Sequence, residues 1–191
     1  MRMIQQMISW LPQLLNGAKI TILLTLCAVS MGLLLSIFLA LGKMSRNKIL
    51  SGICSVYIFF FRGTPLLMQL YFIYFGLPQI NMALTINSRF FAAFLAFSLN
   101  SAAYCSEFIR AAIQSIDRGQ FEASKALGLS KAQTMRLVIF PQSIRRLVPS
   151  VANEFIMVLK DASLVSIIAL ADLTKVTRAI SSSTGTAMVY I

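Results

Sequence analysis

The sequence predicts an all-α fold, a polytopic integral membrane helix bundle, and two observations lead to that prediction. Hydrophobic residues make up 58% of the chain and charged residues only 12%. Soluble domains carry about 25% charged residues, so this chain has too little polar surface to cover a water-soluble globule. Long apolar runs also recur along it, and a helix of about 20 apolar residues crosses a hydrocarbon core of about 30 Å. We expect a single domain, 1–191, with four visible crossings at about residues 20–41, 53–76, 90–108 and 147–170.

The first two predicted crossings differ in regularity. Residues 20–41 are uncharged and mainly Leu, Ile, Val and Ala, whereas the second apolar run is interrupted by Arg62-Gly63-Thr64-Pro65. Proline lacks a backbone N–H and biases the residue before it away from the helical region, so we expect a bend at Thr64 and a new start at Pro65. A lone arginine in an apolar run is costly. Arg62 either reaches the lipid headgroups or holds the second crossing against a neighbour, and we favour the structural role.

The distribution of lysine and arginine predicts the orientation, because cytoplasmic segments carry an excess of both. The smaller group of basic residues lies before the first crossing, before the third and after the fourth. The larger group follows the first crossing or lies between crossings three and four, so we expect the N-terminus outside and the loop 109–146 in the cytoplasm. This larger group comprises Lys43, Arg46, Lys48, Arg110, Arg118, Lys125, Lys131, Arg136, Arg145 and Arg146.

Polar residues gather in the third and fourth crossings. Glu107 and Arg110 are three residues apart near the cytoplasmic end of the third, where an intrahelical ion pair is expected. Asn100 and Tyr104 either line a pathway or join helices by hydrogen bonds. In the fourth crossing, Glu154 and Asp161 share one helical face, as do Asn153 and Lys160. Ionisable groups within a membrane face a cavity or one another, so this stripe either contacts a solute or fixes helix packing, and both interpretations stay open.

The loop 109–146 has local structure of its own. Residues 121–127 predict a short helix, and Gly128 suits the left-handed position just past a helix end. Ser130 with Gln133 three residues later predicts a capping box that starts a second helix. We expect this second helix to run to about Phe140 and to be stopped by Pro141.

The residues of this loop resemble a known pattern. Glu122-Ala123-Ser124, then Gly128, then Val138-Ile139-Phe140-Pro141 resemble the cytoplasmic EAA loop of ABC-importer permeases, with Ser124, Val138 and Phe140 as departures. Three further stretches are similar to the branch of that family that takes up polar amino acids of the histidine, glutamine and arginine type. They are Phe61-Arg62-Gly63-Thr64-Pro65, the run from Asn100 to Tyr104 with Glu107 and Arg110, and Lys160-Asp161-Ala162-Ser163-Leu164.

The resemblance implies a division of labour in a bacterial cytoplasmic (inner) membrane. Two permease subunits, alike or different, enclose the pathway, two cytoplasmic ABC ATPase subunits bind ATP and Mg, and an external or periplasmic binding protein delivers the solute. This chain has no phosphate-binding loop of the form G-x-x-x-x-G-K-[ST], so we expect a permease rather than an enzyme, with no cofactor of its own. The resemblance assigns ATPase coupling to Glu122, Ala123, Gly128 and Pro141. Candidate pathway residues are Asn100, Tyr104, Glu154, Lys160, Asp161 and Ser163, and structural residues are Arg62, Pro65, Glu107 and Arg110.

Other functions fit the sequence less well. An embedded enzyme or metal site is disfavoured, since the chain has no histidine, six acidic residues and three cysteines without paired spacing. Nucleic acid is disfavoured because basic residues flank apolar runs instead of forming one stripe. A membrane scaffold or sensor that retains the ATPase-docking loop stays open. Members of the family continue into a fifth crossing, which we expect after Ile191, so we expect a chain truncated at its C-terminus; function with four crossings is the alternative.

Overall fold

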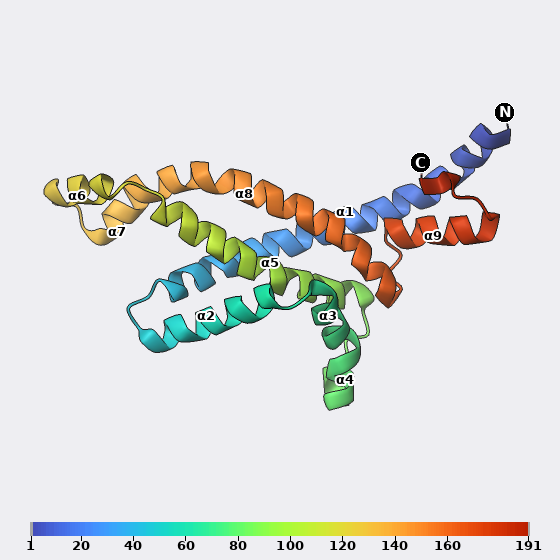
Figure 1. The fold of residues 1–191 in the computed structure, drawn as a ribbon, viewed down its shortest axis with the longest axis horizontal. Helices are drawn as coiled ribbons and strands as arrows, with labels where there is room; N and C mark the ends of the chain where they lie inside the picture. Colours follow the sequence, from blue (N-terminus) through green and yellow to red (C-terminus); the bar gives the residue numbers. More distant parts are fainter. Residues whose placement is uncertain (1, 191) are drawn as a thin grey trace. The chain divides into compact units, whose positions relative to one another are not determined.

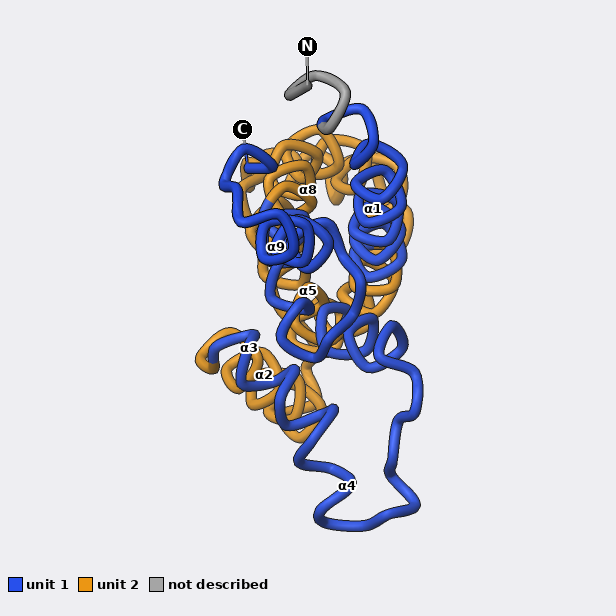
Figure 2. The backbone as a smooth tube through the Cα atoms, turned by 90° about the vertical axis from the view of Figure 1, so that its right-hand side faces the viewer, with its two compact units in different colours: residues 1–29, 65–98, 157–191 blue, residues 30–64, 99–156 orange. Residues whose placement is uncertain are grey.

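A computed structural model describes residues 2–190 and the side chains of residues 7–190 (Figure 1). The described residues form α-helices, with short 3₁₀ and π segments, and no strand. The predicted all-α fold class is therefore confirmed. The chain divides into two compact units, one made of residues 1–29, 65–98 and 157–191 and the other of residues 30–64 and 99–156 (Figure 2). We call them unit 1 and unit 2.

Three long helices contribute residues to both units. They are α1 (Arg2–Lys43), α5 (Arg89–Gln114) and α8 (Phe140–Asp161). Within the described chain, the segment Met7–Lys43 is long and apolar enough to cross a membrane by itself. The segments Lys48–Gly63 and Leu66–Ile80 meet that requirement only together, as a broken span or a re-entrant loop. No further helix of the described chain meets the requirement, so the number of four crossings stays a prediction.

The predicted break in the second apolar run is confirmed. Helix α2 (Lys48–Gly63) ends before Thr64, whose backbone is extended at φ −113° and ψ 143°. Pro65 then caps α3 (Leu66–Tyr71), where its missing N–H costs no helical hydrogen bond. The predicted crossing 53–76 is thus two helical segments with a π segment, η1 (Phe72–Gly76), at its end. The short helices α4 (Leu77–Ile80) and η2 (Met82–Leu84) follow.

The predicted crossing 147–170 also differs from a single α-helix. Helix α8 ends at Asp161 and continues as a 3₁₀ segment, η4 (Ala162–Ile168). A 3₁₀-helix has three residues per turn, so Ala162, Val165 and Ile168 fall on one side, and all three are buried. The segment ends at Ala169, which has a left-handed φ of 60°. The 3₁₀ segment thus presents one buried face with a period of three residues.

A further helix in unit 1 was not predicted. Helix α9 (Leu173–Thr184) begins at Asp172, whose buried carboxylate accepts hydrogen bonds from the backbone N–H groups of Thr174 and Lys175. The N–H of Leu173 donates to the Thr21 hydroxyl of α1 at 3.1 Å. The α9 helix ends at Gly185, and η5 (Met188–Tyr190) completes the described chain. Ordinary capping chemistry therefore orders a segment whose hydropathy is mixed.

Small residues of α5 contribute to the core of unit 2. Ser101, Ala102 and Ala103 of α5 are fully buried. Opposite them on α1 stands Gly32, where an added Cβ would lie 2.9 Å from the Ser101 Cβ. Small residues let helix backbones approach closely, as is typical of packing within a membrane. The close approach of Gly32 to Ser101 thereby fixes residues 99–114 of α5 against α1 within unit 2.

Candidate functional site

The loop between α5 and α8 contains two helical segments with the predicted turn between them. Helix α6 (Arg118–Ala126) is capped by Asp117, whose side chain accepts from the Gly119 N–H at 2.7 Å. Gly128 adopts a φ of +73°, which confirms the left-handed glycine. Ser130 and Gln133 form the predicted capping box at the start of α7 (Lys131–Gln133). Local rules therefore determine the shape of this loop.

The prediction that Pro141 stops the second helix is wrong. After α7, the π segment η3 (Thr134–Ile139) leads directly into α8, and Pro141 is the second residue of α8. The N–H of Phe140 donates to the Met135 carbonyl, a bond of the wider π pattern. Because proline is tolerated in the first turn of a helix, Pro141 fits at this change of helix type. The loop outside α5 and α8 is consequently shorter than 109–146.

The four residues assigned to coupling are all exposed to solvent. Glu122 and Ala123 lie on α6, Gly128 in the turn after it, and Pro141 at the start of α8. The departure from the family pattern, Ser124, is buried, and its hydroxyl donates to the Gln120 carbonyl at 2.7 Å. The serine hydroxyl thus has its hydrogen-bond partner within its own helix, while Glu122, Ala123, Gly128 and Pro141 are exposed.

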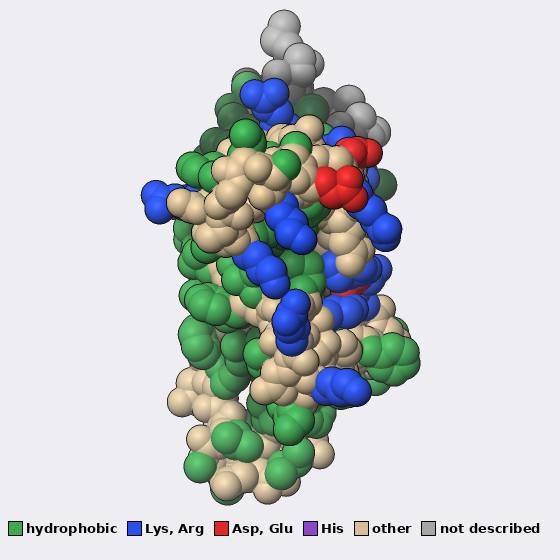
Figure 3. All heavy atoms as spheres, turned by 90° about the vertical axis from the view of Figure 1, so that its left-hand side faces the viewer, with side chains coloured by type: hydrophobic (Ala, Val, Ile, Leu, Met, Phe, Trp, Pro, Cys, Tyr) green, Lys and Arg blue, Asp and Glu red, His purple; other side chains and the backbone are tan. Residues whose placement is uncertain are grey.

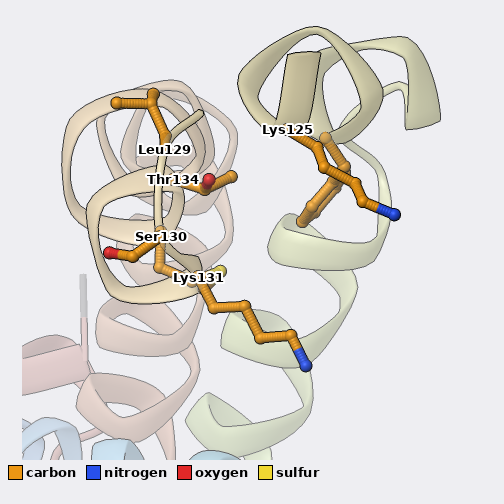
Figure 4. Close-up of a pocket in the computed structure, with 7 residues that line it drawn as sticks. Lys125, Leu129, Ser130, Lys131 and Thr134 are labelled. Carbon is orange, nitrogen blue, oxygen red and sulfur yellow. The ribbon is translucent and has the colours of Figure 1, made fainter. Parts of the chain in front are cut away.

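A cavity of about 580 Å³ lies between α6 and the segment that runs from Leu129 through α7 into η3. Figure 4 shows Lys125 on one side of it and Leu129, Lys131 and Thr134 on the other. Phe121 and Met135 add apolar walls. The two lysine side chains extend toward the same side of the view (Figure 4). The cavity therefore combines an apolar interior with a cationic rim, a feature that sequence analysis missed because its walls come from both helices.

In the view onto the end that carries α6 and α7, more lysine and arginine than aspartate and glutamate side chains are visible, set among hydrophobic and uncharged surface (Figure 3). Arg146 is tied to this region by a hydrogen bond that its guanidinium donates to the Ser115 carbonyl. The side-chain amide of Gln142 on α8 donates to the side-chain carbonyl of Gln120 on α6 at 3.1 Å. The exposed loop is thus both basic and fixed to the helices beside it.

A second group of charged residues surrounds Glu107 in unit 2. The predicted Glu107–Arg110 ion pair is present, with Nη2 2.6 Å from Oε2. Lys43 of α1 approaches the other oxygen at 2.7 Å, and Arg62 of α2 approaches Oε2 at 3.9 Å. The hydrogen bonds to Glu107 raise the pKa of Arg110 above its ordinary value. We call these four residues the Glu107 cluster; it links α1, α2 and α5, as the structural roles proposed for Arg62, Glu107 and Arg110 require.

The candidate pathway residues on α5 have partners within the chain. The Asn100 amide donates to the Phe61 carbonyl at 3.0 Å, close to the C-terminus of α2. The Tyr104 ring lies under the Arg62 guanidinium, 5.1 Å from its centroid. Tyr57, which sequence analysis missed, donates its hydroxyl to the Leu99 carbonyl at 2.8 Å. These contacts join helices; whether Asn100 and Tyr104 also meet a solute stays a prediction.

The candidate residues of the fourth crossing differ in exposure. Glu154 is buried and Asp161 is half-buried, whereas Lys160 and Ser163 are exposed. Among the described residues, Lys160 and Asp161 form no ion pair with each other, so a mutual ion pair is not the way in which these two residues would fix helix packing. Glu154 belongs to unit 2 and the other three to unit 1. Their role in a pathway stays a prediction.

Comparison with known proteins identifies the family. The model of the family described as binding-protein-dependent transport system inner membrane component matches residues 32–191. The chain belongs to this family. It is therefore a permease component of an ABC importer, and ATP is hydrolysed by a separate subunit, not by this chain. The family places it in the inner membrane and implies ATPase and binding-protein partners.

Relatives of this permease are named for the transport of different solutes. A putative glutamine transport system permease protein of Rickettsia bellii is 40% identical over 95% of this chain and 84% of its own length. The arginine transport system permease protein of Bacillus subtilis is 42% identical over 85% of this chain and 73% of its own length. The nopaline transport system permease protein of Agrobacterium fabrum is 36% identical, covering 95% and 78%.

Solved structures agree with this assignment. The crystal structure of an amino acid ABC transporter with histidines matches with a TM-score of 0.91 and 43% identity, over 97% of this chain and 86% of the other. An inward-facing structure of the MetNI methionine ABC transporter matches with a TM-score of 0.76 at 20% identity, over 94% and 85%. The second likeness shows that the fold of the permease is kept at low identity.

Proposed function

We propose that this permease is the transmembrane subunit of an ATP-driven importer for polar amino acids, and that the segment from α6 to η3, residues 118–139, couples it to a separate ATPase. We call this segment the α6–η3 loop. The observation that carries the coupling is the exposure of Glu122, Ala123 and Gly128 on a segment held by its own caps and turn. A rigid, outward-facing segment transmits a push from a partner into the helices that hold it. The lysine and arginine side chains visible on this face in Figure 3 favour a partner that carries acidic groups.

The coupling path follows from chain continuity. The α6 helix is joined through the Gly128 turn and α7 to η3, which enters α8 without a break. Closure of the ATPase subunits on bound ATP and Mg would move α6, and α8 would carry the displacement toward the residues of the fourth crossing. The π segment at residues 134–139 is the least regular part of this path, and π segments are frequent at functional sites.

The substrate class rests on the relatives and on the polar residues of α5 and α8. The relatives are named for glutamine, arginine and nopaline, and a solved relative for amino acids. An amino acid carries one positive and one negative group, and both need partners inside a membrane. We assign that role to Glu154, Lys160 and Asp161, with Asn100, Tyr104 and Ser163 as further candidates. The remaining partners of this permease are a second permease subunit and an external binding protein.

The orientation belongs to the same proposal. The N-terminus lies outside and the α6–η3 loop lies in the cytoplasm, where an ABC ATPase is available. The excess of lysine and arginine in this loop and after α1 supports this orientation.

Co-purification tests the coupling. The variant Gly128→Trp places a bulky side chain on a left-handed residue, which strains the turn between α6 and α7. Gly185→Trp is the matched control, because Gly185 also has a positive φ and open space around it but follows α9 in unit 1. We expect the ATPase to co-purify with the wild type and with Gly185→Trp, and to be lost from Gly128→Trp. Retention by both variants would show that the contact with the ATPase does not depend on the Gly128 turn, and absence of the ATPase from the wild type would favour a membrane scaffold over an importer subunit.

A further inference from the structure

A shallow pocket beside the Glu107 cluster has no role in the proposed import cycle. It has a volume of about 340 Å³. Its lining combines two cations with an apolar wall and belongs entirely to unit 2. The lining residues are Lys43, Ser55, Ile58, Phe59, Arg62 and Gly63.

The charges around this pocket do not balance. Lys43, Arg62 and Arg110 all approach the single carboxylate of Glu107. That carboxylate is bonded closely by Lys43 at 2.7 Å and by Arg110 at 2.6 Å, whereas Arg62 stays at 3.9 Å. One negative charge against three positive ones leaves an excess of positive charge. An anion on the open side of Arg62 would reduce this excess.

Arg62 is accessible to such an anion. Its side chain is 42% exposed, and its guanidinium lies over the Tyr104 ring, 5.1 Å from the ring centroid. A guanidinium presents five N–H donors in a rigid fork that matches the oxygens of a phosphate. Lys43, on the same pocket, supplies a second positive charge. The geometry is therefore suited to a phosphate group and not to a neutral solute.

The depth and the surroundings of the pocket point to a lipid. Lys43 is the last residue of the segment Met7–Lys43 that is able to span a membrane, and basic residues at the ends of spans lie at headgroup level. The pocket residue Phe59 is 81% exposed and belongs to an apolar face of α2. This face follows helical spacing and consists of Ile49, Ile53, Val56, Phe59 and Phe60, all at least half exposed.

We propose that this pocket binds the phosphate of an anionic phospholipid, with Arg62 and Lys43 on the phosphate and the acyl chains against Phe59 and the apolar face of α2. Basic clusters at the cytoplasmic surface attract anionic lipids. A soluble phosphate would satisfy the cations but would leave the adjoining apolar face uncovered, whereas an amphiphile matches both. The bound lipid would complete the junction of α1, α2 and α5.

Lipid titration of the purified full-length chain tests the proposal. Delipidated protein in mild detergent is titrated with phosphatidylglycerol or phosphatidylcholine, and bound lipid is counted by native mass spectrometry. Arg62→Gln removes one cation, and Ser55→Asp keeps the Glu107 cluster but places a carboxylate in the pocket lining. Lys48→Gln is the matched control, since Lys48 is also a basic residue of α2 but lies outside the pocket.

We expect the preference for phosphatidylglycerol to fall about fivefold in both pocket variants and to stay unchanged in Lys48→Gln. Excess inorganic phosphate should not displace the lipid from the wild type. An equal loss in Lys48→Gln would show attraction by overall surface charge and would overturn the assignment, as would unchanged binding in Ser55→Asp. Displacement by inorganic phosphate would assign the pocket to a soluble anion, and loss of a second copy of the chain together with the lipid would assign it to a subunit contact.

Discussion

The α5 helix and the α6–η3 loop both carry motif residues, but they use them in opposite ways. On α5, Asn100, Glu107 and Arg110 bond to groups of the same chain. In the loop, Glu122, Ala123 and Gly128 face solvent. Motif residues with internal partners hold helices together, whereas exposed ones on a rigid segment are available to another subunit. Substitutions should therefore separate into those that unfold the permease and those that uncouple it.

The largest effect on stability should come from Glu107→Gln. Its side chain is only 12% exposed, and the change leaves Lys43, Arg62 and Arg110 without their carboxylate. We expect the free energy of unfolding to fall by about 2–3 kcal/mol, below the range for fully buried pairs because the partners are partly solvated. Denaturant titration in mixed micelles measures it. Glu122→Gln on the exposed loop is the control, with a change within about 0.5 kcal/mol; equal effects would break the distinction between the two regions.

A somewhat smaller effect should follow from Gly32→Val on α1. The added side chain meets the Ser101 Cβ at 2.9 Å and the Ala102 backbone nitrogen at 3.2 Å. Overpacking of this kind costs about 1–3 kcal/mol. Gly52→Val is the matched control, because a Cβ at Gly52 of α2 meets nothing within 4 Å. The same unfolding titration compares the two, and a control as unstable as Gly32→Val would show that helix propensity, not packing, sets the result.

The smallest effect on stability should come from the loop itself. Ser130→Ala removes the side-chain oxygen that accepts from the Gln133 N–H. Loss of such a cap costs about 1 kcal/mol, and the cost is local because Ser130 is exposed. Hydrogen exchange should quicken at Gln133 and its neighbours in α7 while the amides of α5 stay protected. Faster exchange throughout α5 would mean that the loop and the membrane helices unfold as one.

Sequence rules predicted what depends on neighbours along the chain. The left-handed Gly128, the capping box of Ser130 and Gln133 and the break before Pro65 all follow from local backbone chemistry. The Glu107–Arg110 pair also belongs here, since three residues separate its members on one helix. Such features are determined within one or two helical turns, so a single sequence is enough to predict them.

The rest depends on tertiary contacts or on a competition between local rules. The contact of Lys43 with Glu107 joins residues 64 positions apart, and no spacing rule connects them. Pro141 was expected to stop a helix, but the preceding π segment lets it occupy the first turn of α8. Helix α9 was missed because its buried cap, Asp172, stands in a stretch of mixed hydropathy. The cavity of Figure 4 has walls from two helices and was equally hidden.

The central claim is that the exposed loop contacts the ATPase, and site-directed cross-linking tests it most directly. Ala123→Cys places a thiol on α6, and Ala179→Cys is the matched control, an exposed alanine on α9 of unit 1. Membranes that contain the permease and its ATPase are treated with a short thiol cross-linker, and products are identified by mass. We predict a cross-link to the ATPase from residue 123 and none from residue 179. No product from residue 123 while the ATPase co-purifies, or equal products from both positions, would contradict the account.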